Sequence, residues 1–109
     1  MRGTIKSSTE VSDIFSQGER IDTAFITLLV SPRRGLTGRV AFVAGKRNGC
    51  AVWRNSAKRR MREICRELGG PWADYDVVFL AKRRIMKPAY SKVLRACQKG
   101  VASFVEGAS

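Results

Sequence analysis

The sequence predicts a single α+β domain in which helices pack on a small mixed β-sheet. Runs of apolar and β-branched residues typical of strands occur in both halves of the chain, and segments with helical spacing lie before, between and after them. No internal repeat or long linker interrupts this pattern, and 109 residues suffice for one hydrophobic core but not for two. We therefore expect one domain over residues 1–109, in the order helix, two or three strands, helix, strand, helix.

The N-terminal part predicts a short helix followed by two strands. Ser7 with a glutamate three residues later forms a capping-box pattern, and Gly18 ends the helical spacing. Residues 22–31 are apolar and β-branched, which favours a strand, either continuous or bent and split in two. The turn-forming segment 32–38 separates it from a second strand at residues 39–44.

The second half predicts helix, strand and helix. Residues 51–68 are the most strongly determined helix, because the Gly-Gly-Pro sequence of residues 69–71 stops a regular helical pattern. Residues 75–81 form a nearly continuous apolar run, typical of a strand buried on both faces. A last helix is expected from residue 88 to residue 105, weakened in its middle by Gly100.

The charge of the chain is far from balanced. Lys and Arg number 21 against 9 Asp and Glu, which gives a formal net charge of +12 and a pI near 10.7. A polyanionic partner explains such an excess best, and nucleic acid is the leading candidate; the alternative is charge that only keeps the domain soluble. No apolar run is long enough to span a bilayer and the N-terminus lacks a signal-peptide pattern, so a cytoplasmic protein is expected.

Residues suited to catalysis are scarce. The chain has no histidine, which excludes imidazole acid–base chemistry and His-ligated metals. Cys50, Cys65 and Cys97 are odd in number and widely spaced, so we expect reduced, mostly buried thiols instead of disulfides or a zinc site. Asp74 and Asp76 are the nearest carboxylate pair for magnesium, but their spacing beside a strand suits a turn better. We predict no catalytic residue and no metal ligand in this chain.

The central helix sorts its side chains by type. At about 100° per residue its apolar residues form one core-facing stripe. The members of this stripe are Ala57, Met61, Ile64, Cys65 and Leu68. An adjoining arc of about 100° contains no carboxylate. This cationic arc consists of Asn55, Lys58, Arg59, Arg62 and Arg66.

The acids of the same helix lie elsewhere. Glu63 and Glu67 fall beyond the cationic arc, where they could pair with Arg60 or Arg59. A solvated helix face usually mixes charges of both signs, so this separation favours a binding surface. Guanidinium groups bind phosphate oxygens through two hydrogen bonds, which points to a phosphate-containing ligand.

A glycine-bracketed turn at residues 45–49 precedes this helix. Lys46 and Arg47 add two cations, and the helix N-terminus that follows favours anions through its free N–H groups. The turn lacks the glycine spacing of a phosphate-binding P-loop. An ordinary strand-to-helix turn is the alternative.

The segment 46–63 matches a specific pattern. It reads K-R-N-G-C-A-V-W-R-N-S-A-K-R-R-M-R-E and resembles the signature K-K-x-G-x-A-V-x-R-N-R-x-K-R-x-x-R-E of the bacterial ribonuclease P protein family. The resemblance extends from residues 15–18 through the strand at 39–44 to the Y-D-V-V sequence before the last helix. Ser56 and Asn48 depart from the pattern, and the loss of one guanidinium at Ser56 should weaken RNA contact locally.

The resemblance implies both a fold and a role. The fold is an α-β-β-β-α-β-α two-layer sandwich, similar to the second domain of ribosomal protein S5, with a left-handed crossover. The role is that of a protein cofactor for the ribonuclease P ribozyme, which binds the catalytic RNA and the 5′ leader of precursor tRNA and assists 5′-end maturation of tRNA. Hydrolysis would be chemistry of Mg²⁺ bound mainly by the RNA, and the implied protein is a monomer within a ribonucleoprotein, without organic cofactor or membrane partner.

The resemblance also assigns residues. The implied RNA-binding residues are Lys46, Arg47, Arg54, Asn55, Lys58, Arg59, Arg62 and Arg66. The implied leader cleft, with Lys58 and Arg62 at its edge, is lined by Val11, Phe15, Thr27 and Leu29. Trp53 suits packing against the core better than stacking on RNA.

Two other functions compete with this one. An autonomous metal-dependent nuclease would need converging carboxylates, and purified chain without RNA would then cleave precursor tRNA. A ribosomal or other structural RNA-binding protein without a role in tRNA processing would share the basic helix, and would co-purify with ribosomal RNA.

Overall fold

The computed structural model describes residues 14, 16, 18–32, 38–45, 47, 49–72 and 75–103. The elements in chain order are β1 (Glu19–Asp22), β2 (Ile26–Pro32), β3 (Arg39–Val43), α2 (Ala51–Glu67), β4 (Tyr75–Ala81), the short 3₁₀ helix η2 (Arg83–Met86) and α3 (Tyr90–Ala102). Of the predicted first helix only Ile14 and Ser16 are described, and both are helical.

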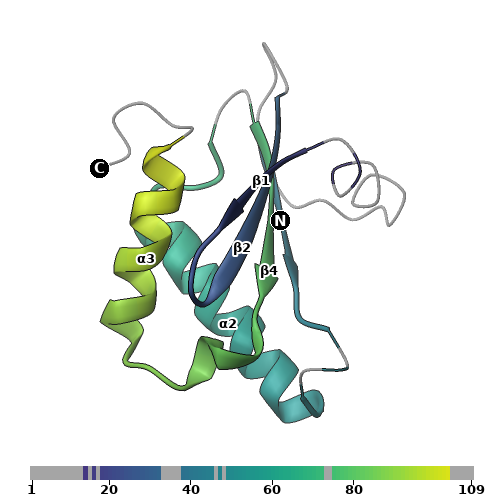
Figure 1. Cartoon of the computed structure of the whole chain (residues 1–109), viewed down its shortest axis with the longest axis vertical. Coiled ribbons are helices and arrows are strands. Elements are labelled where there is room, and N and C mark those ends of the chain that lie inside the picture. Colours follow the sequence, from purple (N-terminus) through teal and green to yellow (C-terminus); the bar gives the residue numbers. More distant parts are fainter. Residues whose placement is uncertain are drawn as a thin grey trace.

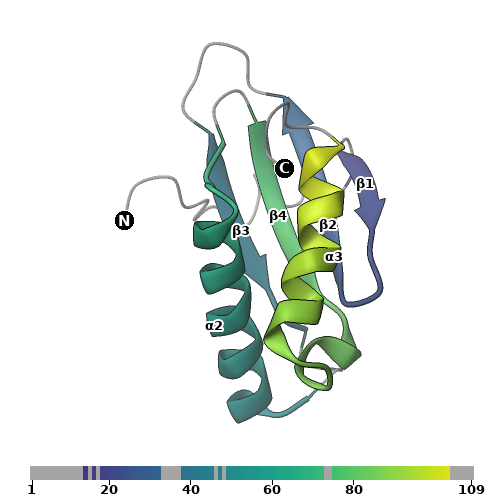
Figure 2. The same cartoon turned by 90° about the vertical axis from the view of Figure 1, so that its left-hand side faces the viewer.

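The strands form a four-stranded mixed sheet in the order β1-β2-β4-β3. The β1–β2 and β2–β4 pairs are antiparallel, and β3 runs parallel to β4. Helices α2 and α3 cover the same face of this sheet (Figures 1 and 2). With these helices toward the viewer in Figure 2, β3 and β4 run downward and β4 lies to the right of β3, so the β3–α2–β4 crossover is left-handed. The α+β sandwich expected from the sequence is confirmed.

The first predicted strand is split in two. Thr23 interrupts residues 22–31: its Oγ1 accepts hydrogen bonds from the backbone N–H of Phe25 (3.3 Å) and Ile26 (3.0 Å) and donates one to the Ile26 carbonyl (2.6 Å). Such a hydroxyl turn replaces ladder hydrogen bonds locally. The preceding part of the chain pairs back on β2 from Glu19 onward, which the sequence did not indicate.

Alternation along the strands sends side chains to both faces of the sheet. Ile26, Leu28 and Val30 point to the helices and join Phe79 in the main core. Trp72 stacks on Phe79 with a centroid distance of 6.1 Å. The opposite face carries a smaller buried cluster, formed by Ile14, Leu29, Ala41 and Val78.

The helix ends follow the predicted signals with two differences. Helix α2 ends one residue earlier than expected, and Gly69 after it takes a positive φ of 88°, as a helix-terminating glycine does. Helix α3 begins at Tyr90 and not at Pro88, because the chain first forms η2 and buries Ile85 completely. The expected end of α3 at residue 105 lies outside the described residues.

Gly100 has a packing role that its helix propensity does not reveal. A Cβ built there would lie 3.0 Å from Leu28 Cδ1 and 3.4 Å from Ile21 Cγ2. The missing side chain therefore lets α3 approach β1 and β2 closely.

None of the helices in the described ranges has the length and apolar character needed to cross a bilayer.

Candidate nucleic-acid interface

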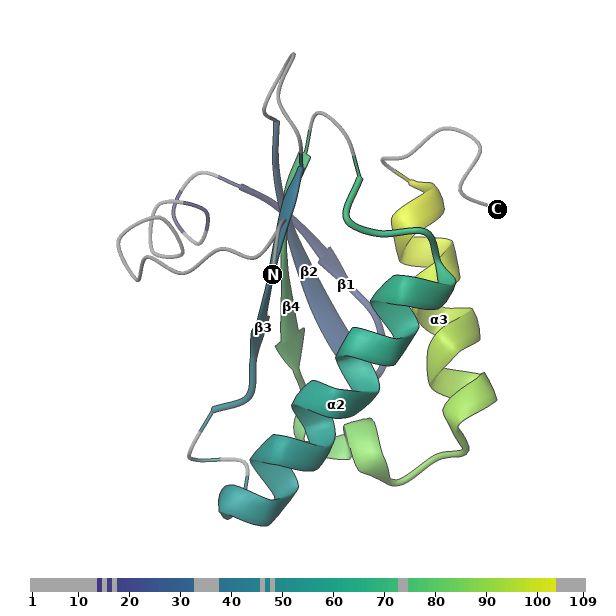
Figure 3. The ribbon, with the colours of Figure 1, turned by 180° about the vertical axis from the view of Figure 1, so that it is seen from behind.

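Helix α2 is held by its apolar stripe. Ala57, Met61 and Ile64 are fully buried and Cys65 nearly so, as the spacing predicts. Figure 3 shows α2 between β3 on one side and α3 on the other. The stripe therefore fixes which flank of α2 faces each neighbour.

The flank toward β3 is the cationic arc. Its side chains Asn55, Arg59, Arg62 and Arg66 are exposed and Lys58 is half-buried. Within the described part of the chain, no cation of the arc takes part in an ion pair. The sequence prediction of an exposed cationic flank without carboxylate partners is therefore confirmed; its contact with RNA remains a prediction.

A hollow of about 350 Å³ lies between the cationic arc and the open edge of the sheet. Val40 and Phe42 of β3 line one side, and Arg59, Arg62, Glu63 and Arg66 of α2 line the other. The Arg62 guanidinium carbon lies 5.9 Å from the Phe42 ring centroid, within the range of a cation–π contact. The ring thus supports one guanidinium without removing its hydrogen-bond donors.

The flank of α2 toward α3 is built differently. Arg60 Nη1 donates to the carbonyls of Ile85 (3.0 Å) and Pro88 (2.9 Å), and the guanidinium lies 6.0 Å from the Tyr90 ring centroid. The Tyr90 hydroxyl donates to Glu67 Oε2 at 3.0 Å. Burial, followed by this hydrogen bond, raises the pKa of Tyr90 to about 12.

The expected pairing of helix acids with helix arginines is wrong. In the described residues no ion pair joins Glu63 or Glu67 to Arg59 or Arg60. Arg60 instead donates to backbone carbonyls around η2, and Glu67 accepts a hydrogen bond from Tyr90. Tertiary contacts, which helical spacing does not contain, decide these pairs.

The start of α2 favours negative charge. Cys50 occupies the N-cap position, and the nearby backbone N–H groups of Trp53 and Val52 lower the pKa of its exposed thiol. The same N–H groups would favour a phosphate oxygen. Arg47, just before, is exposed, and Lys46 lies outside the described residues. An anion-favouring turn is thus supported, and Cys50 is the exposed one of the three cysteines.

The other two cysteines are buried as expected. Burial raises the pKa of both Cys65 and Cys97 to about 12. All three cysteines are free.

Two residues in the first turns of α2 are partly covered. Trp53 packs against the main core, which confirms a packing role. Arg54 is half-buried, and its Nε is shielded from solvent without a hydrogen-bond partner. Arg54 therefore presents less surface to a ligand than the arginines of the cationic arc.

The sheet face opposite the helices holds the predicted cleft residues that are described. Thr27 and Leu29 lie on this face but are 1% and 3% exposed, and Thr27 Oγ1 donates to Asp22 Oδ1 at 2.7 Å. Val11 and Phe15 lie outside the described residues. Thr27 pairs with Leu80, which pairs in turn with Val43, and both of these are half-buried.

Leu80 and Val43 therefore supply surface that the sequence reading missed. Strand alternation predicts that Leu80 shares a face with Val78, but only the pairing register places Leu80 beside Thr27.

The carboxylates do not assemble a metal site in the described residues. Asp76 is the second residue of β4 and not part of a turn; it is 4% exposed and pairs with the Arg39 guanidinium at 2.9 Å. Asp74 lies outside the described residues. No group of three or more Cys, Asp or Glu side chains in the described ranges is arranged to hold a metal ion.

These features define a class. An α+β sandwich that exposes one unpaired cationic helix flank beside an anion-favouring helix start is a basic nucleic-acid-binding protein.

Comparison with known proteins narrows this class to a family. The model of the family described as Ribonuclease P matches residues 2–105. The ribonuclease P protein component of Natranaerobius thermophilus is 34% identical over 94 residues, covering 84% of this chain and 81% of the relative. That of Syntrophomonas wolfei is 30% identical over 90 residues, covering 82% and 76%.

Solved structures agree on the fold. The ribonuclease P protein of Thermotoga maritima superposes with a TM-score of 0.79 at 21% identity, covering 97% of this chain and all of its own. That of Staphylococcus aureus gives a TM-score of 0.81 at 16% identity, covering 94% and 95%. The chain belongs to the ribonuclease P protein family, the protein component of the bacterial ribonuclease P ribonucleoprotein. This membership decides against the ribosomal alternative.

Proposed function

We propose that this chain binds the catalytic RNA of ribonuclease P through the cationic arc and the turn before α2, and the 5′ leader of precursor tRNA on the opposite face of the sheet. In this way it assists maturation of the tRNA 5′ end. The observation that carries the proposal is the separation of charge on α2. Its exposed cations all lie on the flank toward β3, and Glu67 is bound by Tyr90 on the other flank. Glu63 also lines the hollow beside β3, but it forms no ion pair with a described cation.

The number of cations on the proposed RNA surface predicts how strongly RNA binding depends on salt concentration. Four cations of the cationic arc, together with Arg47 and Arg54, give six groups for phosphate oxygens. At about 0.7 counterions per contact with folded or single-stranded RNA, six contacts give a log–log salt slope of roughly −4. Affinity for the catalytic RNA should therefore fall steeply as salt rises.

The leader face offers apolar contact. Among its described residues, half-buried Leu80 lies beside the buried Thr27, and half-buried Val43 lies beside Leu80. A leader strand would meet these aliphatic side chains. Packing of sugars or bases on such a surface is tolerant of sequence, which suits a substrate leader that varies between tRNAs.

The net charge of the chain suits a role in bringing two RNAs together. The catalytic RNA and precursor tRNA are both polyanions, and a domain of net charge +12 reduces their repulsion. In this proposal Mg²⁺ is bound mainly by the RNA, and the chain contributes no catalytic residue and no organic cofactor. It would act as a protein monomer in a cytoplasmic ribonucleoprotein.

Reconstitution tests this proposal. The chain is added to a bacterial ribonuclease P RNA at low Mg²⁺, and cleavage is compared for precursor tRNA with a long leader and with a single-nucleotide leader. We expect the protein to restore cleavage at low Mg²⁺ and to tighten binding of the long-leader substrate more. Cleavage by the protein alone, or equal effects on both substrates, would contradict the proposal.

A further inference from the structure

We propose that a second cationic groove, between α3 and the β1–β2 turn, binds another strand of the same catalytic RNA. The inference rests on the proposed function, because it extends the RNA contact of the chain beyond the α2 flank. It concerns a surface that none of the RNA-binding or cleft residues predicted from the sequence touches.

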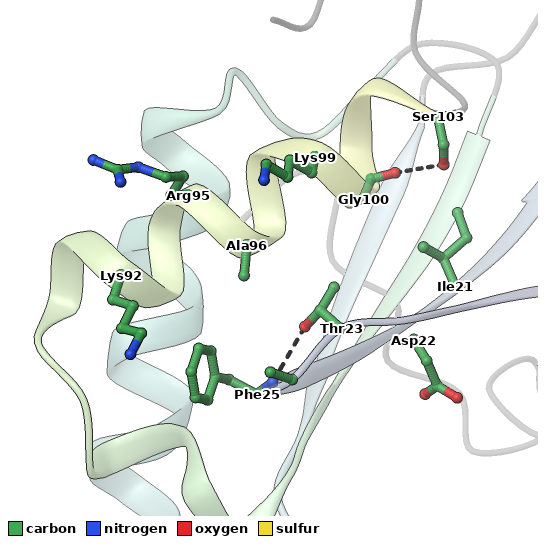
Figure 4. A pocket seen from close by; sticks show the side chains of 11 residues that line it. Ile21, Asp22, Thr23, Phe25, Lys92, Arg95, Ala96, Lys99, Gly100 and Ser103 are labelled. Atoms are coloured by element: carbon green, nitrogen blue, oxygen red, sulfur yellow. Dashed lines mark hydrogen bonds between the residues drawn. The ribbon is translucent and has the colours of Figure 1, made fainter.

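The groove consists of two adjoining hollows of about 600 and 360 Å³ that share Phe25 and Lys92. Figure 4 shows the larger one, with α3 on one side and the β1–β2 turn on the other. Ile21, Phe25, Ala96 and Gly100 give it an apolar floor. The close approach of α3 at Gly100 shapes this floor.

The charged side chains among the described lining residues are five cations and one carboxylate, Asp22. The cations are Arg84, Lys87, Lys92, Arg95 and Lys99. Lys92 and Lys99 are seven residues apart, two turns of α3, and therefore lie on one helix face with Ala96 between them. All five side chains are exposed, and none forms an ion pair with any other described residue.

The carboxylate among the lining residues is already engaged. Asp22 accepts a hydrogen bond from Thr27 at 2.7 Å and lies 3.4 Å from Arg20 Nε and 3.5 Å from Lys82 Nζ. Its charge is therefore neutralised locally and does not offset the cations of α3. An apolar floor beneath unpaired cations suits a ribose–phosphate strand.

The position of the groove favours the catalytic RNA over the 5′ leader as its ligand. The groove lies between α3 and the β1–β2 turn, and the cationic arc lies on α2 toward β3. Both helices cover the same side of the sheet (Figure 3). The proposed leader face lies on the other side of the sheet. An RNA folded around the helix layer reaches both cationic surfaces, whereas a leader on the opposite face does not.

The test compares two variants that lose the same net charge. Lys92→Ala/Lys99→Ala removes two cations from the groove, and Arg83→Glu lowers the charge equally at an exposed η2 position that does not line it. Binding to a bacterial ribonuclease P RNA alone is measured over a range of salt concentrations. We expect the double variant to flatten the slope by about 1.4 and to weaken binding on the order of 10-fold at about 0.1 M salt. Arg83→Glu should stay within about twofold of the wild type, because it removes no phosphate contact.

Two outcomes would overturn the inference. Equal affinities of the double variant and Arg83→Glu would show that only net charge matters. Unchanged binding to the catalytic RNA with weakened binding of precursor tRNA to the holoenzyme would assign the groove to the substrate. Arg59→Ala/Arg62→Ala, measured in parallel, separates the two proposals, because it weakens RNA binding if the α2 flank functions, whatever the groove does.

Discussion

The two flanks of α2 use the same residue type for opposite purposes. Arg59 is exposed and has no ion-pair partner among the described residues, whereas Arg60, the next residue, is held by two carbonyls and a tyrosine ring. A rotation of about 100° per residue separates them. One flank thus keeps its donors for a ligand, and the other uses them to join α2 to η2 and α3.

This difference shows that arginine content alone does not define an RNA surface. A guanidinium contributes to ligand binding only if the fold leaves its donors free. Variants on each flank test this difference. They follow in order of their expected loss in the free energy of unfolding.

The stripe that orients both flanks should be the most costly to disturb. Ile64 is fully buried, so Ile64→Ala should lower the free energy of unfolding by about 2 to 5 kcal/mol, as core truncations do. Denaturant unfolding measures this loss. A loss below about 1 kcal/mol would mean that the stripe does not anchor α2.

Arg60→Ala should act on stability and not on RNA affinity. It leaves the carbonyls of Ile85 and Pro88 without their charged donor, which we expect to cost about 1 to 3 kcal/mol. Denaturant unfolding and RNA binding are measured on the same preparation. Weakened RNA binding with unchanged stability would assign Arg60 to the ligand-binding flank.

Tyr90→Phe should change how the stability of the protein depends on pH above about pH 10. The ordinary pKa of 10.0 rises to about 12 in the folded protein, so the folded state keeps the Tyr90 proton longer than the unfolded state. This contribution to stability is complete below about pH 10 and is lost as pH rises toward about 12. The variant should therefore lose less stability than the wild type over that interval, and equal losses would contradict the raised pKa.

Arg59→Ala/Arg62→Ala should have the smallest effect on folding. Both side chains are exposed, so the free energy of unfolding should change by no more than about 0.5 kcal/mol. Thermal and denaturant unfolding measure it. A larger loss would show that these arginines support the fold.

Local patterns predicted a large part of this architecture. The central helix and the strand at residues 75–81 match within one residue, because their apolar periodicity and the Gly-Gly-Pro stop are local signals. The cationic arc was also predictable, since helical geometry alone assigns side chains to flanks. The family was indicated by the residues from Lys46 to Glu63 and is shown by the family match.

Long-range contacts account for what the sequence did not predict. The partners of Arg60 lie on η2 and the segment before α3, and the neighbours of Thr27 depend on strand register. The groove beside α3 joins Phe25 to Lys92 and Lys99, which are far apart in the chain. Spacing within one element contains no information about such contacts.

The most direct test of the α2 flank is the salt dependence of binding to a bacterial ribonuclease P RNA for Arg59→Ala/Arg62→Ala beside Arg60→Ala. We predict that the double variant makes the slope shallower by about 1.4, at about 0.7 per lost contact, while Arg60→Ala keeps the wild-type slope. Equal slopes for all three proteins, or a change confined to Arg60→Ala, would contradict the assignment of RNA binding to the flank that faces β3.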